Sequence, residues 1–168
     1  TFCLTKDELS YPSPYIGDLA DLRSVRALGE AVTRMETLLE IKPEAVACDL
    51  HPRYNSTAFA ESLGLPVVYV QHHYAHILSC MAENEVTEET IGVSFDGTGY
   101  GTDGTVWGGE FLQASPAGFK RLGSIAPFRQ AGGDLSSKEG WRVAVSLLYD
   151  AFGGSGANAK EAVRREAA

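Results

Sequence analysis

Three of the four histidines in this chain lie within five residues of one another, in the stretch VQHHYAHILS. If a helix begins near His72, then His72 and His76 stand one turn apart on one face, and His73 points elsewhere. Two imidazoles at this spacing can bind one cation, with metal–nitrogen distances of about 2.0–2.1 Å. A polar helix start, with histidines that cap backbone groups or face water, explains the same pattern. A metal site therefore needs a third ligand.

The strongest third ligand is Asp96, which ends the apolar run IGVSFD and is followed by glycines at 97, 99 and 101. Glycine lets the backbone approach a ligand closely, and successive N–H groups in such a turn can form an anion-binding nest. We therefore predict a metal–phosphate site whose glycine-rich turn consists of Gly97, Thr98, Gly99, Tyr100 and Gly101. A hairpin with a turn-favouring aspartate is the alternative. The glycine spacing matches neither a Walker A loop nor a dinucleotide fingerprint.

Three other places are weaker candidates. Glu110 follows two glycines, and we expect it to be an exposed strand residue. Asp49 and His51 lie at the carboxyl end of a predicted strand, where parallel sheets place ligands, but capping of the next helix explains them equally well. The segment at 132–134 precedes a helix, and we expect a plain loop there.

The elements that must position these residues follow from hydrophobic spacing and from breakers. The order of the predicted helices and strands indicates an α/β fold. A parallel sheet covered by helices is followed by an antiparallel three-strand meander, and together these strands should form a mixed sheet. A capping box of Ser136 and Glu139 should begin the last helix. The predicted helices are 22–41, 55–63, 72–83 and 136–152, and the predicted strands are 45–50, 65–70, 91–96, 105–114 and 118–128. The strands at 45–50, 65–70 and 91–96 should be buried, and a glycine-rich turn should cover 97–104. The prolines at 12 and 14 predict a loop over 11–19.

Composition narrows the class of protein. The chain has 168 residues and a formal net charge of −8, and it contains no basic cluster, so binding to a nucleic-acid backbone is not expected. Its three cysteines have neither metal nor redox spacing, which fits a reducing cytosol. No apolar run is long enough to span a membrane, so we expect a cytoplasmic protein. We expect one domain with an ordered lobe at about 11–152 and a polar tail at 153–168.

Taken together, the motifs resemble a known family. The stretches ACDLHPRYNSTAFAESLGLPVVYVQHHYAHILSCMAE and GVSFDGTGYGTDGTVWGGEFL are similar to the HypF carbamoyltransferases, which are maturation factors for [NiFe] hydrogenases. YIGDL and GGD…WRVAVSLL fit the same family, so the resemblance covers about residues 13–149. The broader superfamily, with the Kae1/TsaD-type enzymes, resembles the actin/Hsp70-like (ASKHA) ATPase fold, and this chain resembles its first lobe.

The resemblance implies roles for the candidate residues. The first and last histidines of the HHxAH motif, here His72 and His76, bind a divalent metal that is iron or zinc, and Asp96 belongs to the same metal–nucleotide centre. Full-length members form carbamoyl-adenylate from carbamoyl phosphate and ATP in an upstream domain. The Kae1-like domain then transfers the carbamoyl group to the C-terminal cysteine of the partner HypE.

Two alternatives stay open at this stage. One is a TsaD-type tRNA threonylcarbamoyl transferase lobe, which the net charge of −8 and the motif GYGTDGTVWGGE disfavour. The other is a non-catalytic interaction module of the same fold. In either case the second lobe, with its further metal and adenosine contacts, lies outside this chain, so we expect the isolated chain to be inactive.

Overall fold

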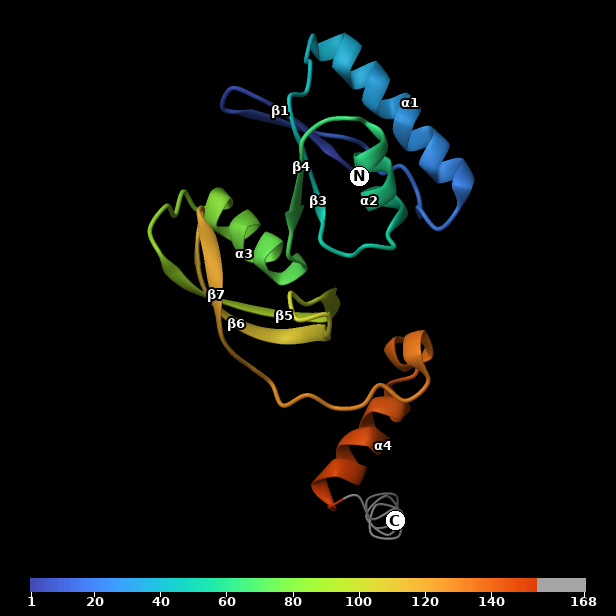
Figure 1. Ribbon diagram of the computed structural model, residues 1–168, viewed down its shortest axis with the longest axis vertical. Helices are drawn as coiled ribbons and strands as arrows, with labels where there is room; N and C mark the ends of the chain where they lie inside the picture. Colours follow the sequence, from blue (N-terminus) through green and yellow to red (C-terminus); the bar gives the residue numbers. More distant parts are fainter. Residues whose placement is uncertain (154–168) are drawn as a thin grey trace. The chain divides into compact units, whose positions relative to one another are not determined.

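The computed structural model describes residues 1–153, and the chain divides into two compact units, Thr1–Arg121 and the residues from Leu122 onward. The expected tail at 153–168 lies almost wholly outside the described residues. Within 1–153 the order of elements is β1 (Cys3–Lys6), β2 (Leu9–Pro12), α1 (Leu22–Leu39), β3 (Val46–Asp49), α2 (Asn55–Ser62), β4 (Val67–Val70), α3 (His72–Glu83), β5 (Thr90–Tyr100), β6 (Val106–Ser115), β7 (Gly118–Ser124), the 3₁₀ helix η1 (Gly133–Ser137) and α4 (Gly140–Ala151) (Figure 1).

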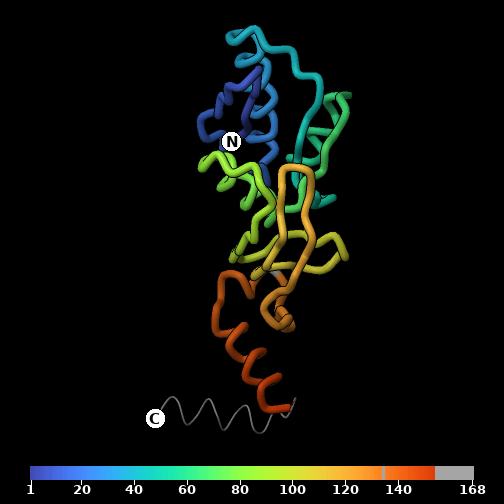
Figure 2. The backbone as a smooth tube through the Cα atoms, turned by 90° about the vertical axis from the view of Figure 1, so that its left-hand side faces the viewer, coloured from blue at the N-terminus to red at the C-terminus, as the bar shows by residue number. Residues whose placement is uncertain are grey.

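The strands of the described residues form three separate small sheets. β1 and β2 pair antiparallel, β3 and β4 pair parallel, and β5, β6 and β7 follow in sequence order in a third sheet. The parallel pair and the three-strand meander are confirmed, since a tight turn joins β6 to β7 (Figure 2) and parallel strands would need a long crossover. The expected single mixed sheet is wrong for residues 1–153, because no strand of the parallel pair hydrogen-bonds to a strand of the meander.

The parallel pair places two strand ends side by side. Asp49 pairs with Val70 in register, and the Leu50 N–H donates to the Val70 carbonyl oxygen over 3.0 Å. β4 then leads directly into α3, so the end of β3 lies beside the first turn of that helix. Contrary to expectation, β4 is not a buried strand, because Val68 and Tyr69 are 55% and 47% exposed.

Helix α3 packs on one face of the meander, and this contact holds the main core (Figure 1). Large apolar side chains on both elements become buried there, which stabilises the packing of helix on sheet. The cluster consists of Tyr74, Ile77 and Met81 from α3 and Trp107, Leu112 and Ala114 from β6. Because His72, Asp96 and the glycines belong to these two packed elements, the core fixes their relative position.

The start of the last helix differs from the prediction. The Ser136 hydroxyl donates to the Gly133 carbonyl oxygen over 2.7 Å inside η1, and α4 begins only at Gly140. The carboxylate of Glu139 accepts from Arg142 Nε over 2.6 Å instead of capping the backbone. The capping box is therefore wrong, because a short 3₁₀ turn precedes the helix.

No helix that the structure describes, within residues 1–153, is long and apolar enough to cross a membrane.

Candidate metal centre

The side chain of Gln71 fixes where helix α3 begins. Its Oε1 accepts a hydrogen bond from the Tyr74 N–H over 2.9 Å, and its Nε2 donates to the Tyr100 carbonyl oxygen over 3.2 Å. An N-cap side chain that accepts from the third helical N–H is a typical helix start. The helix therefore begins at His72, as the sequence predicted, and His72 and His76 lie on one face.

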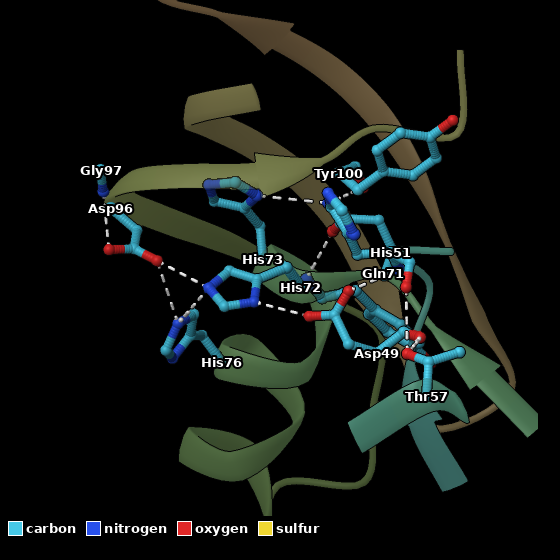
Figure 3. A network of polar contacts seen from close by, with 11 residues as sticks. Asp49, His51, Thr57, Gln71, His72, His73, His76, Asp96, Gly97 and Tyr100 are labelled. Atoms are coloured by element: carbon cyan, nitrogen blue, oxygen red, sulfur yellow. Dashed lines mark hydrogen bonds and ion pairs between the residues drawn. The ribbon is translucent and has the colours of Figure 1, made fainter. Parts of the chain in front are cut away.

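A bulge in strand β5 brings Asp96 to these histidines. The β5–β6 register runs from Phe95 opposite Gly109 to Gly99 opposite Trp107, so three residues of β5 face one residue of β6. Bulges of this kind redirect a side chain and are frequent next to active sites. The Gly97 N–H donates to Asp96 Oδ1 over 2.6 Å, which leaves Oδ2 directed at the histidines (Figure 3).

Three donor atoms from these residues converge. His72 Nε2 lies 2.7 Å from Asp96 Oδ2 and 3.3 Å from His76 Nε2, and His76 Nε2 lies 3.5 Å from Asp96 Oδ2. Donor atoms around a metal at about 2.0–2.1 Å stand roughly 3 Å apart, so these spacings fit one shared cation. Two imidazoles and one carboxylate with open positions suit zinc and ferrous iron. His76 and Asp96 are exposed, so a substrate can reach the remaining positions.

Asp49 binds the other nitrogen of His72. Its Oδ2 lies 2.9 Å from His72 Nδ1, while its Oδ1 accepts the His51 N–H over 2.8 Å (Figure 3). The helix-capping alternative for Asp49 is wrong, because Tyr54 is the N-cap of α2 and has no side-chain cap. The sequence pointed to Asp49 but not to its pairing with His72. The signal was available, since neighbouring parallel strands end at the same edge.

Hydrogen bonds and neighbouring charges in the cluster raise the pKa of His72 and lower the pKa of Asp96. Burial opposes protonation of His72, but the hydrogen bonds and charges of Asp49 and Asp96 outweigh it and raise the pKa of that imidazole. The Gly97 N–H, and then the neighbouring His72 and His76, lower the pKa of Asp96 against its partial desolvation. Asp96 is therefore an ionised acceptor near neutral pH, which is the form that binds a cation.

His73 points away from the cluster, as its position in the helix predicted. Its side chain is fully buried, with Nδ1 3.2 Å from Gln71 Nε2. Because that amide nitrogen can only donate, Nδ1 is the acceptor and Nε2 carries the proton. Desolvation, helped by His72, lowers the pKa of His73, so it remains neutral.

The glycine-rich segment is part of strand β5, and the expected turn over 97–104 is wrong for most of its length. Only the residues after Tyr100 form the turn, where the Gly101 N–H donates to the Thr105 carbonyl oxygen over 2.8 Å. A Cβ atom on Gly99 would lie 2.7 Å from the His73 ring and 2.8 Å from His72 Cβ. Gly99 therefore lets α3 approach the strand, whereas Gly97 and Thr98 are exposed.

The other candidate residues take part in contacts outside the metal cluster. Glu110 is only 1% exposed, so the expectation of an exposed strand residue is wrong; its carboxylate accepts from Arg121 Nε over 2.6 Å. The His51 ring stacks on Tyr54 with 4.0 Å between centroids. Gly132 and Gly133 both have positive φ, and the 3₁₀ helix η1 begins at Gly133, so the expected plain loop is wrong for 133–134.

Two family models match this chain. Residues 1–83 match the HypF Kae1-like domain, and residues 92–168 match the second subdomain of the carbamoyltransferase Kae1-like domain. The chain belongs to the HypF family. This result decides in favour of the HypF resemblance, and the fold is that of a HypF Kae1-like segment.

A relative named carbamoyltransferase HypF, from Synechocystis sp., is 42% identical over 91% of this chain. A relative named probable carbamoyltransferase HypF, from Methanocaldococcus jannaschii, is 38% identical over 91% of the chain. A crystal structure of full-length HypF in a phosphate- and nucleotide-bound form matches with a TM-score of 0.82 and 42% identity over 88% of the chain. The structure of T. kodakarensis HypF matches with a TM-score of 0.80 and 36% identity over 88% of the chain. The chain spans only about a fifth of the length of each of these relatives.

Proposed function

We propose that this chain is the metal-binding lobe of a HypF-type carbamoyltransferase. The observation that carries the proposal is the convergence of His72 Nε2, His76 Nε2 and Asp96 Oδ2 within 2.7–3.5 Å of one another. Membership of the HypF family supports carbamoyl transfer as the reaction, since a relative is named carbamoyltransferase HypF.

In this proposal the three residues hold a divalent metal, iron or zinc, beside the nucleotide. A bound divalent ion would supply positive charge to offset phosphate and to polarise the carbamoyl carbonyl. Asp96 Oδ1 keeps its bond to the Gly97 N–H over 2.6 Å, so the carboxylate stays directed at the centre.

The segment of Gly97, Thr98, Gly99, Tyr100 and Gly101 is our proposed nucleotide-binding strand. Gly97 and Thr98 carry this proposal, because they are exposed next to Asp96 and lie in the bulge. Gly97 also has open space where a Cβ atom would stand, so a phosphate can approach its backbone.

The proposed substrate is carbamoyl-adenylate, formed from ATP and carbamoyl phosphate elsewhere in the full-length protein. The thiolate at the C-terminus of a HypE-type partner attacks the carbamoyl carbon, a C–S bond forms, and AMP leaves. We further propose that this chain, residues 1–168, belongs to a single actin/Hsp70-like (ASKHA) domain and is one of its two lobes. A second lobe then closes over the nucleotide, which explains the exposure of His76 and Asp96 here.

The test is His76→Ala in the full-length protein. We expect loss of carbamoyl transfer to the partner thiol, measured as mass gain on its cysteine, and loss of bound metal. Pyrophosphate release from ATP with carbamoyl phosphate should persist, because that step belongs to another domain. Removal of one of two imidazole ligands severely weakens such a centre.

Cys80→Ala is the matched control, because Cys80 is exposed one helical turn after His76 and lies outside the cluster. It should leave both reactions and the metal content unchanged. If His76→Ala retains metal and transfer, the centre is not catalytic. If it abolishes both reaction steps in a folded protein, the proposed division between domains is wrong.

A further inference from the structure

The imidazole of His72 lies between two carboxylates with different surroundings. Its Nε2 faces Asp96, 2.7 Å away, together with His76. Its Nδ1 faces Asp49, 2.9 Å away, on the side opposite the convergence of donor atoms (Figure 3). We propose that Asp49 is a positioning residue that accepts the Nδ1–H of His72 and so keeps the Nε2 lone pair directed at the metal. This inference rests on the metal centre proposed above.

The carboxylate of Asp49 is held before any ligand arrives. Its Oδ1 accepts the His51 N–H over 2.8 Å, so only Oδ2 is free for His72. The Thr57 hydroxyl, 1% exposed as a residue, lies 3.2 Å from the Asp49 carbonyl oxygen and 3.0 Å from that of His51. A buried hydroxyl therefore ties down the backbone on which the carboxylate stands.

His72 and His76 differ in how many neighbours hold their rings in place. Among residues 1–153, the polar contacts of the His76 side chain are all made through Nε2, and this side chain is 56% exposed. The side chain of His72 is 28% exposed and has a partner on each ring nitrogen. A carboxylate behind a ligating imidazole fixes its tautomer and raises its basicity. His72 is thus the anchored ligand, and His76 is the one free to adjust.

The neighbouring backbone makes Asp49→Asn a tautomer-inverting substitution. The His51 N–H can only donate, so it holds the amide oxygen of an asparagine at the position of Oδ1. The amide NH₂ then faces His72 Nδ1, which must accept. The ring proton moves to Nε2, where it blocks metal binding. Asp49→Ala removes the same charge but leaves the tautomer free.

The experiment measures Co²⁺ affinity of the full-length protein after removal of bound metal, with Co²⁺ alone as the probe. We expect Asp49→Ala to weaken binding about tenfold and Asp49→Asn about a hundredfold. His72→Ala should lose binding almost completely. Asp18→Asn is the matched control, because Asp18 Oδ1 accepts the Ala20 N–H two residues on, over 2.9 Å, in the same kind of turn. It should leave Co²⁺ affinity unchanged.

The possible outcomes distinguish a failure of the positioning role of Asp49 from a failure of the metal centre. Equal losses for Asp49→Ala and Asp49→Asn would mean that Asp49 acts through its charge alone, which overturns the positioning role. Unchanged Co²⁺ affinity in both Asp49 variants would also overturn the positioning role, provided that His72→Ala loses Co²⁺ binding. If His72→Ala binds Co²⁺ as the unaltered protein does, the proposed centre fails and this inference falls with it.

A measurement on the unaltered protein covers the case in which neither variant folds. Proton NMR of the Co²⁺-loaded form should show a slowly exchanging, strongly shifted ring N–H, because Asp49 shields the His72 Nδ1 proton from water. The Nδ1 proton of His76 should exchange quickly, because that side chain is 56% exposed. Absence of any slowly exchanging ring proton would overturn the role of Asp49.

Discussion

At the scale of single residues, protonation of His72 has opposite effects on folding and on metal binding. In the metal-free protein, desolvation opposes the charge, but Asp49 and Asp96 raise its pKa above the ordinary 6.5. A raised folded-state pKa contributes stability that is fully present below the unfolded value and is lost as pH rises through the folded value. A metal needs the neutral imidazole, so its binding strengthens as pH rises.

We therefore predict two trends of opposite sign in the full-length protein. Without metal, His72→Gln should lower the melting temperature more at about pH 5.5 than at about pH 8.5. Asp96 remains ionised at the lower pH, because the Gly97 N–H and His72 lower its pKa. The rise in melting temperature on Co²⁺ addition should be larger at the higher pH. A metal-free difference that grows with pH would contradict the pairing of His72 with both carboxylates.

The ion pair of Glu110 and Arg121 is a second residue-scale feature. Arg121 Nε donates to Glu110 Oε2 over 2.6 Å, and the Glu110 side chain is 2% exposed. The guanidinium also lies over the Trp107 ring, 4.1 Å from its centroid. Removal of one partner from a buried pair leaves an uncompensated charge, which costs far more than the pair itself contributes.

Arg121→Met should lower the free energy of unfolding by about 3 kcal/mol, measured by urea denaturation. Arg23→Met is a matched control, since Arg23 pairs with Asp21 at the same 2.6 Å, with side chains 91% and 41% exposed. Exposed pairs contribute little, so the control should show no measurable change. Similar losses in both variants would show that burial of Glu110 is not what makes its pair matter.

At the scale of elements, the close approach of α3 to β5 depends on small residues in the strand. Gly99 has no room for a Cβ atom, since it would lie 2.7 Å from the His73 ring. Gly97, two residues earlier in the same strand, has nothing within 4 Å of that position. Both glycines have ordinary negative or extended φ, so the difference between them is one of space.

Gly99→Ala should therefore destabilise the full-length protein by about 2 kcal/mol and weaken Co²⁺ binding, because it displaces the start of α3. Gly97→Ala should leave both properties nearly unchanged. Urea denaturation and Co²⁺ titration check the pair. A larger loss of stability or of Co²⁺ affinity in Gly97→Ala would show that the position of α3 does not depend on close packing at Gly99.

Local patterns predicted most elements but not their irregularities. The one-turn spacing of His72 and His76 follows from a helix start, and a buried Gln71 side chain caps that start. The bulge that redirects Asp96 depends on the register between two strands, which no local pattern contains. The β1–β2 hairpin was also missed, because Pro12 and Pro14 gave the signal of a loop.

Burial was the least predictable property. Glu110 follows two glycines in a strand, and nothing near it in sequence indicated Arg121, eleven residues later on β7. The pairing of Asp49 with His72 likewise spans the distance from β3 to α3. The partner of Glu110 becomes visible only once the strand order is known, whereas the predicted parallel strands already indicated the edge that Asp49 and His72 share.

At the scale of the whole molecule, β5 presents an apolar face that the described residues leave open. Ile91, Val93 and Phe95 alternate along the strand and are 67%, 54% and 67% exposed, whereas Gly92 and Ser94 face the side of α3. The sequence predicted a buried strand here. The matched part is 20% of the Synechocystis relative, so most of a full-length HypF protein lies outside it.

We expect this face to be covered in the full-length protein and open in the isolated segment. Ile91→Thr with Val93→Thr keeps β-propensity and removes apolar surface. In the isolated segment the double substitution should lower self-association and binding of a hydrophobic dye, because large exposed apolar patches cause both. In the full-length protein it should lower the free energy of unfolding by about 2–4 kcal/mol, since the same side chains are then buried. Asp18→Asn, on the exposed loop before α1, should change neither measurement. If the double variant of the full-length protein is as stable as the unaltered one, no other part of the chain covers β5.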